Sequence, residues 1–193
     1  MKSWRSILLA IVIGAVGIGG FIFVLRSVVE PKPVSQNQED VLSLSLLNNL
    51  EYYHSYCKVP LKLTDGVFQW TNDYPCEEEK SLGFLFQIYN SKAAFGDLNF
   101  DGKDDAAVVL TTHMGGSGNF RELAVVLNQN GVFKHVASVD LGDRVIIENV
   151  SIQDSHIVLD MVVHGPGEGY CCPTQQARNM FQFDTAQNKL IKL

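Results

Sequence analysis

From residue 59 onward, the chain is a succession of short apolar or alternating segments separated by turn-forming residues. Asp65-Gly66 and Asn130-Gly131 are dipeptides that favour the tight turns of β-hairpins. We therefore predict strands over residues 59–63, 67–70, 84–89, 105–112, 120–127, 132–139, 144–152, 157–163, 178–183 and 189–193. Strands of this length joined by hairpin turns predict an antiparallel meander, folded as a sandwich or as a partly open barrel.

Residues 39–50 precede these strands and predict a helix of about three turns. Glu39 and Asp40 at its start complement the helix dipole. Leu42, Leu46 and Leu50 recur at helical spacing, which predicts a Leu stripe packed against the sheet. The expected class is therefore mainly β, with α+β as the alternative.

The N-terminal part of the chain predicts a membrane anchor. Ile7–Leu25 is a run of nineteen residues without a charge, long enough to span roughly 28 Å as a helix. Lys2 and Arg5 precede it, which favours a cytoplasmic N-terminus and a translocated domain. A cleaved signal peptide is the alternative, but the run is longer than the usual apolar region and no A-x-A-like site precedes Arg26.

These features divide the chain into three parts. Residues 1–27 form the predicted transmembrane anchor, residues 28–38 a linker with Pro31 and Pro33, and residues 39–193 an extracytoplasmic domain in the periplasm or outside the cell. After residue 30 the chain carries 12 Lys+Arg and 20 Asp+Glu, a net charge of −8. This acidic balance opposes binding to nucleic acid or to an anionic membrane surface.

The chain has four cysteines, and outside the cytoplasm they predict disulfides rather than a zinc site. Cys57 and Cys76 are favoured as a pair, because a bridge between them would close a loop of about twenty residues. Cys171 and Cys172 are adjacent, and a direct bond between neighbours requires a strained ring. Pairing of these two across to Cys57 and Cys76 stays open.

Specific chemistry is concentrated in residues 97–105. Asp97, Asn99 and Asp101 alternate, Gly102 follows at the sixth position, and Asp105 stands at the ninth. With the carbonyl of Lys103, they offer about five oxygens to Ca²⁺, which prefers six to eight. The twelfth position holds Val108 where a helix–loop–helix EF-hand has a bidentate Glu. The competing interpretation is an Asx-rich turn that binds nothing.

This loop resembles the EF-hand-like calcium loops of dockerin modules and of FG-GAP repeats. Read with later segments, the chain also resembles a family of uncharacterised bacterial exported or lipoprotein-like domains, over residues 47–185. The segments that carry the resemblance are Gly96–Leu110, Gly115–Phe120, Leu123–Asn128, Leu141–Val145, His164–Glu168 and Cys171–Thr174. The resemblance implies an extracytoplasmic location and no established activity. This chain carries Phe100 where members of that family typically have Gly.

Two further segments carry polar residues. Gly115–Asn119 lacks the following helix of a phosphate loop, which favours a hairpin loop. His164, Glu168, Cys171 and Cys172 match no zinc spacing, which favours a loop closed by oxidised cysteines over a soft-metal site.

We therefore expect a membrane-anchored, non-catalytic binding or interaction domain with a structural Ca²⁺ loop, and an envelope protein or polymer as its partner. The alternative is an envelope-associated hydrolase that uses residues of the 113–119 and 164–168 loops. That alternative requires a concave pocket that gathers His113, His164 and Glu168. A scaffold or inhibitor whose calcium loop is vestigial is a third possibility.

Overall fold

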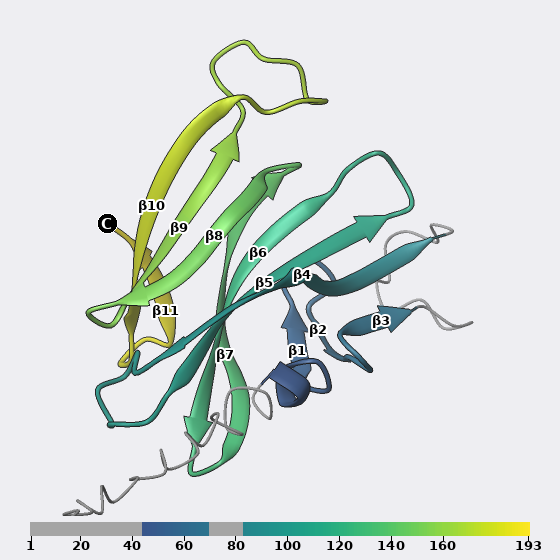
Figure 1. Ribbon diagram of the computed structural model, residues 1–193. Coiled ribbons are helices and arrows are strands. Elements are labelled where there is room, and N and C mark those ends of the chain that lie inside the picture. The colour runs from purple at the N-terminus through teal and green to yellow at the C-terminus, as the bar shows by residue number, and fades with distance from the viewer. Residues whose placement is uncertain (1–43, 70–82) are drawn as a thin grey trace, which may run out of the picture. The chain divides into compact units, whose positions relative to one another are not determined.

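The computed structural model describes residues 44–69 and 83–193, which all belong to one compact unit, Gln36–Leu193. Its strands form three antiparallel sheets, none of them closed into a barrel (Figure 1). The first sheet is the hairpin of β1 (Glu51–His54) and β2 (Val59–Lys62). The mainly β, antiparallel prediction is confirmed.

The five-stranded sheet has the order β3-β4-β5-β6-β7. Its strands are β3 (Val67–Gln69), β4 (Phe84–Gly96), β5 (Asp105–Met114), β6 (Phe120–Gln129) and β7 (Val132–Asp143). The four-stranded sheet has the order β11-β10-β9-β8. Its strands are β8 (Ile146–Gln153), β9 (His156–Val163), β10 (Gln175–Asp184) and β11 (Lys189–Lys192).

The five-stranded sheet is the middle layer of the fold, and both of its faces are covered. On one face, side chains such as Ala107, Val109 and Leu123 pack against Ile157 and Phe181 of the four-stranded sheet. The other face carries a second apolar cluster, made by Ala106, Val108, Leu110, Ala124 and Val126 with Leu47, Tyr52, Leu61 and Leu63 from the N-terminal segments.

Burial on both faces explains the sequence of the two central strands. After its first residue, Asp105, β5 carries the unbroken apolar run Ala106–Leu110, and β6 carries Leu123–Leu127. Successive side chains of a strand point to opposite faces, so strands of a sheet with one solvent-exposed face alternate apolar and polar residues. A strand that is buried on both faces carries a continuous apolar run, as β5 and β6 do.

The two larger sheets approach closely at the end of β4. A Cβ added to Gly96 would lie 2.9 Å from Cγ2 of Ile152 on β8, which is closer than real side chains pack. Glycine at this position therefore lets the connection after β4 begin directly beside the four-stranded sheet.

Two predicted turns form, with different outcomes for the strands beside them. Asn130 and Gly131, with φ of 58° and 87°, join β6 to β7 as a hairpin. Asp65 and Gly66, with φ of 51° and 81°, also form a tight turn, bridged by Thr64 and Val67. The predicted pairing of 59–63 with 67–70 is nevertheless wrong, because β2 pairs with β1 and β3 pairs with β4.

The N-terminal prediction is corrected at two further points. Helix is present over 44–47, and residues 39–43 lie outside the described residues. Leu46 is 42% exposed while Leu47 is fully buried, so Leu47 and not the predicted stripe residue Leu46 contacts the core.

β4 extends to Gly96, well beyond the predicted 84–89, and its ladder with β5 shifts between Ile88 and Ala93.

The predicted anchor and most of the linker fall outside the described residues, as does Cys76. Within the part of the chain that the structure describes, no helix is long and apolar enough to cross a membrane.

Candidate calcium loop and neighbouring polar clusters

The predicted calcium loop connects two adjacent strands of the middle sheet. β4 ends at Gly96 and β5 begins at Asp105, so the loop spans residues 97–104 and its last predicted ligand is the first residue of a buried strand. Leu98 is 1% exposed and fixes the loop to the apolar core between the two larger sheets.

The side chains of the loop turn inward onto its own backbone. The Asp101 amide donates to Asp97 Oδ1 at 3.1 Å and to Asn99 Oδ1 at 3.0 Å. The Gly102 amide donates to Asp97 Oδ2 at 2.9 Å, and the Lys103 amide donates to Asp101 Oδ1 at 2.9 Å. These Asx-type bonds bring three of the predicted ligand side chains together around one tight turn.

Asp105 has a different position from the other predicted ligands. It is fully buried, and its two carboxylate oxygens accept hydrogen bonds from the Leu98 amide (3.1 Å) and the Asn128 amide (2.9 Å). It therefore joins the loop to the end of β6. Sequence reasoning assigned Asp105 to a cation and did not anticipate this bridging role.

The charges of the loop interact with one another. Partial burial opposes ionisation of Asp97, but backbone amides of Gly102, Phe100, Asp101 and Asn99 together hold the pKa of Asp97 below its ordinary value. Burial raises the pKa of Asp105, the amides of Asn128 and Leu98 oppose this, and the charges of Asp101 and Asp97 raise it further.

Two residues of the loop adopt left-handed backbone conformations. Gly102 has φ of 81°, and a Cβ there would meet nothing within 4 Å. Phe100, which stands where the resembling family has Gly, has φ of 64° and is 75% exposed. The turn therefore forms with Phe at this position, at a steric cost that Gly would not incur.

The loop is also close to cationic charge from its own chain. Lys103 Nζ lies 3.9 Å from Asp101 Oδ2 and donates to Asn130 Oδ1 at 2.8 Å. Both partners of the ion pair are exposed, so it neutralises the loop weakly. Over the described ranges, no group of three or more His, Cys, Asp and Glu side chains is gathered closely enough to hold a metal ion.

The residues of the loop still fit Ca²⁺ in the chemistry of their donors. Ionised carboxylate oxygens have two acceptor positions each, and the backbone amides occupy one at Asp97 Oδ1, Asp97 Oδ2 and Asp101 Oδ1. Hard oxygen ligands at alternate positions of a tight turn are what Ca²⁺ prefers.

No model of a known protein family, no curated protein and no solved structure matches this chain. The resemblance described from the sequence therefore stays a prediction.

The cysteines fall into two groups. Cys57 is disulfide-bonded, whereas Cys171 and Cys172 are exposed free thiols. The pairing of Cys57 with Cys76 stays a prediction, because Cys76 lies outside the described residues. A hydrogen bond between the two neighbours, more than burial, raises the pKa of Cys172.

Arg144 connects the 115–119 hairpin loop to the β9–β10 connection, which also contains the 164–168 loop of the hydrolase alternative. Its guanidinium donates to the Ser117 carbonyl at 2.9 Å and to the Tyr170 carbonyl at 2.6 Å. The connection containing Tyr170 extends past the ends of β9 and β10 at the top of Figure 1. The side chain of one arginine thus holds the 115–119 hairpin loop against this connection.

The residues proposed for a hydrolase are gathered only in part. Glu168 accepts hydrogen bonds from Thr174 and from the Gly165 amide (2.9 Å). These bonds lower the pKa of Glu168, and the charge of the nearby His164 lowers it by a smaller amount. Both ring nitrogens of His164 are buried without a hydrogen-bond partner in the described structure. His113 interacts instead with Arg121, which together with burial lowers the pKa of His113.

Sequence reasoning missed two charged residues that lie side by side on β6. Arg121 is 5% exposed, contacts Thr111 and Asn119, and lies 4.1 Å from the ring centre of Tyr89. Glu122 is also 5% exposed and points to the opposite face of the sheet. Charged residues are rarely this buried without a specific partner, but the sequence shows them only as Arg-Glu at the start of an apolar run.

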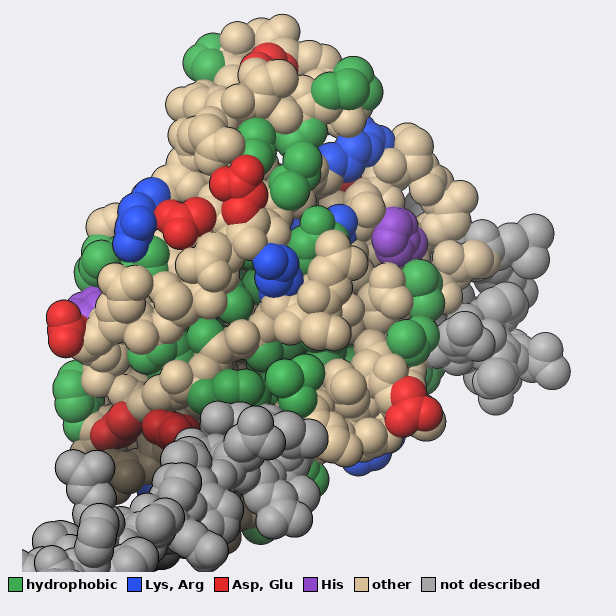
Figure 2. Space-filling model, in the orientation of Figure 1, with side chains coloured by type: hydrophobic (Ala, Val, Ile, Leu, Met, Phe, Trp, Pro, Cys, Tyr) green, Lys and Arg blue, Asp and Glu red, His purple; other side chains and the backbone are tan. Residues whose placement is uncertain are grey.

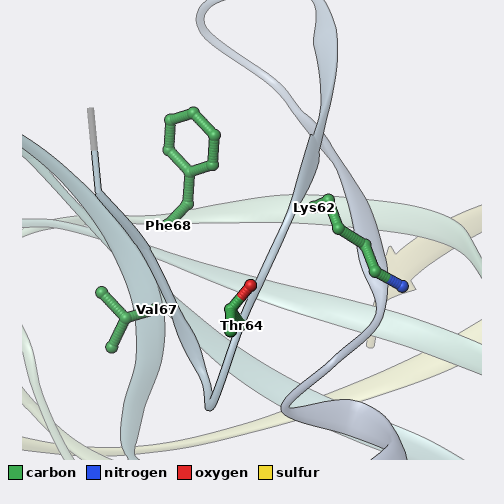
Figure 3. A pocket seen from close by; sticks show the side chains of 4 residues that line it. All are labelled: Lys62, Thr64, Val67 and Phe68. Carbon is green, nitrogen blue, oxygen red and sulfur yellow. The ribbon is translucent and has the colours of Figure 1, made fainter. Parts of the chain in front are cut away.

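Neither the charged side chains on the face in Figure 2 nor the side chains around one open hollow converge on a single point. Basic and acidic side chains are scattered over the face shown in Figure 2. An open hollow of about 490 Å³ is lined by Lys62, Thr64, Val67 and Phe68. In Figure 3 the Lys62 side chain extends away from Val67 and Phe68, so these groups do not converge on one point.

Proposed function

We propose that this protein is a membrane-tethered, extracytoplasmic binding domain without catalytic activity, in which the 97–105 loop takes Ca²⁺ as a structural ion. The observation that carries the proposal is the convergence of Asp97 and Asn99 side-chain oxygens, both within 3.1 Å of the Asp101 amide nitrogen. Asp101 closes the same turn through its bond to the Lys103 amide.

Electrostatics favour a cation in this loop. Asp97, Asp101 and Asp105 lie close enough for the first two to raise the pKa of the third. Like charges held together are unfavourable unless a proton or a cation compensates them. Backbone amides supply part of this compensation, and Ca²⁺ would supply more through Asp97, Asn99, Asp101 and the Lys103 carbonyl, with water completing its shell.

The bound ion would act on the fold and not on a reaction. Asp105 begins β5 and also receives the Asn128 amide, so the loop determines where the ladder between β5 and its neighbours starts. Fixing the loop with a cation would stabilise that register. An extracytoplasmic position, where Ca²⁺ is abundant, would allow a modest affinity to suffice.

The direct test is isothermal titration of Ca²⁺ into the full chain in detergent, combined with thermal unfolding in Ca²⁺ and in EDTA. Ca²⁺ that binds the native state selectively raises the melting temperature, and EDTA lowers it again. Absence of both a binding heat and an EDTA effect would overturn the calcium part of the proposal.

A pair of matched substitutions locates the site. Asp101→Asn removes one charge from a predicted ligand, while Asp104→Asn removes one charge from an exposed position that is off the alternation. We expect the first to weaken Ca²⁺ binding about tenfold or more and the second to leave it within about twofold. Equal losses would mean that the loop attracts Ca²⁺ only through its overall charge.

The membrane part of the proposal depends on the apolar run Ile7–Leu25. Protease added to intact cells or spheroplasts should digest the C-terminal domain, while the membrane fraction retains the chain. A soluble, protease-protected protein would contradict this location.

A further inference from the structure

A second polar site lies on the face of the middle sheet that the β1–β2 hairpin covers. Glu122 projects from β6 onto this face, beside the apolar side chains of Ala124 and Val126. The residue is 5% exposed, and its Oε2 atom is buried with no hydrogen-bond partner among the described residues. A buried carboxylate oxygen without a partner is costly, so a native one requires an explanation.

Glu122 faces a cavity of about 390 Å³. This volume lies within the range of small-molecule sites, which are usually mostly apolar with a few polar groups. Met114 and Phe120 form an apolar wall, and Ser55 and Tyr56 enter from the connection between β1 and β2. The cavity thus combines an apolar wall with one buried acid.

A second acid stands at the rim of this cavity. Asp140 on β7 is directly opposite Glu122 in the β6–β7 ladder, and it is exposed. Like charges directly opposite one another on neighbouring strands are destabilising. Burial, followed by a smaller effect of Asp140, raises the pKa of Glu122, while a Ser55 hydrogen bond and Lys58 lower it.

The charged groups that face the cavity therefore carry an excess of negative charge when Glu122 is ionised. Glu122 and Asp140 oppose one cation, Lys58, which is exposed and forms no ion pair with the described residues. His54 lies behind the cavity wall, bonded to Thr112, and burial holds its pKa near 4, so it is neutral. A cation entering the cavity would restore the balance and supply the missing partner of Oε2.

We propose that this cavity binds the ammonium group of a small organic amine, with Glu122 as the buried counter-charge, Asp140 at the entrance, and Met114 and Phe120 against the apolar body of the ligand. Binding places one positive charge between the Glu122 and Asp140 carboxylates, and the buried carboxylate oxygen of Glu122 gains a donor. The site is separate from the 97–105 loop, and it names a ligand class for the binding role proposed above.

The test is calorimetric titration of the full chain in detergent with benzylamine, and with benzyl alcohol as the uncharged analogue. We expect benzylamine to bind and benzyl alcohol to bind at least tenfold more weakly. Equal affinity for the amine and the alcohol would overturn the proposal.

Glu122→Gln is the decisive variant, because it keeps the shape and removes the charge, and Glu51→Gln on the exposed end of β1 is its control. We expect at least a tenfold loss of benzylamine affinity in the first variant and an unchanged affinity in the second. If Glu122→Gln does not fold, Asp140→Asn at the exposed rim should still weaken binding severalfold, and unchanged affinity there would overturn the proposal.

Lys58→Met gives an independent check of the ligand class. Removing the competing cation should strengthen benzylamine binding, whereas weaker binding would show that the cavity is built for an anionic or zwitterionic molecule. Chelation of Ca²⁺ by EDTA should leave amine binding intact, which separates failure of this inference from failure of the calcium loop.

Discussion

His54 shows how a single buried residue can make the fold sensitive to acid. It is fully buried on β1, and its Nδ1 accepts a hydrogen bond from the Cys57 amide at 3.0 Å. Nε2 therefore carries the proton and donates to Thr112 Oγ1, 2.9 Å away. Burial, with a smaller effect of Lys58, lowers the pKa of His54 to about 4.

We predict that acid destabilises the protein through His54. Its folded pKa of about 4 is below the ordinary 6.5, so the neutral form contributes stability that is complete above pH 6.5 and is lost as the pH falls towards 4. The difference between these two pKa values corresponds to roughly 3 kcal/mol in the free energy of unfolding. Urea unfolding across this pH range measures the loss.

His54→Gln should flatten the acid dependence of stability, even though it lowers stability at neutral pH. His156→Gln, at a partly exposed position of β9, should leave the slope unchanged. An unaltered slope in the His54 variant would assign the acid sensitivity to other groups.

Phe100 gives a second prediction for one residue. A non-glycine residue with φ of 64° pays roughly 1 kcal/mol that glycine avoids, and its exposed ring adds little packing. Phe100→Gly should therefore raise the free energy of unfolding by up to about 1 kcal/mol. Asp154→Gly is the control, because Asp154 has a similar φ of 48° but Asp tolerates it better. A destabilised Phe100→Gly variant would contradict this account.

Some residue roles could be predicted from sequence and others could not. The 97–105 alternation predicted a calcium loop, with an Asx-rich turn as the competing interpretation. The hydrogen bonds within the loop have the form of an Asx-rich turn, and the calcium site stays a prediction. The bridging role of Asp105 depends on Asn128, which is distant in sequence. Likewise, the burial of Glu122 depends on Ser55 and the β1–β2 connection, and no local pattern encodes that contact.

At the scale of elements, the 97–105 loop is fixed to its neighbours mainly through Asp105. The Leu98 amide and the Asn128 amide share its carboxylate, so the β4–β5 connection and the end of β6 depend on one side chain.

We predict that Asp105→Ala is strongly destabilising. It leaves two backbone amides without their acceptor in a buried site, which costs about 2 to 4 kcal/mol in the free energy of unfolding. Asp104→Ala, one residue earlier and exposed, should change stability by less than about 0.5 kcal/mol. Urea unfolding in EDTA measures both changes. If Asp105→Ala lost stability only in buffer that contains Ca²⁺, Asp105 would instead act through the ion.

Strands with a clear local pattern were predicted better than strands defined by their partners. β5, β6 and β7 have apolar runs or Asn-Gly turns, and they form where expected. β1 was missed because its buried positions are Tyr52 and His54, a weak apolar signal. The Asp65-Gly66 turn formed, but β2 gains a longer ladder with β1 than the single bridge between Thr64 and Val67 provides.

At the scale of the whole described domain, the segments before and after the middle sheet cover its opposite faces. The N-terminal segments through Leu63 contribute to one apolar cluster, and β8 to β11 contribute to the other. The sequence predicted the antiparallel β class but not this arrangement. A meander of hairpins specifies which strands are adjacent, whereas the choice of face depends on contacts between distant residues.

This arrangement has a consequence for how the domain opens. Either cover can detach while the other still shields the sheet, so the amide hydrogens of β5 and β6 should exchange with deuterium only on global unfolding. Amides of β1 and of β11 should exchange earlier, through separate partial openings. Hydrogen exchange followed by mass spectrometry measures both, and equal protection across all strands would show that the domain unfolds as one unit.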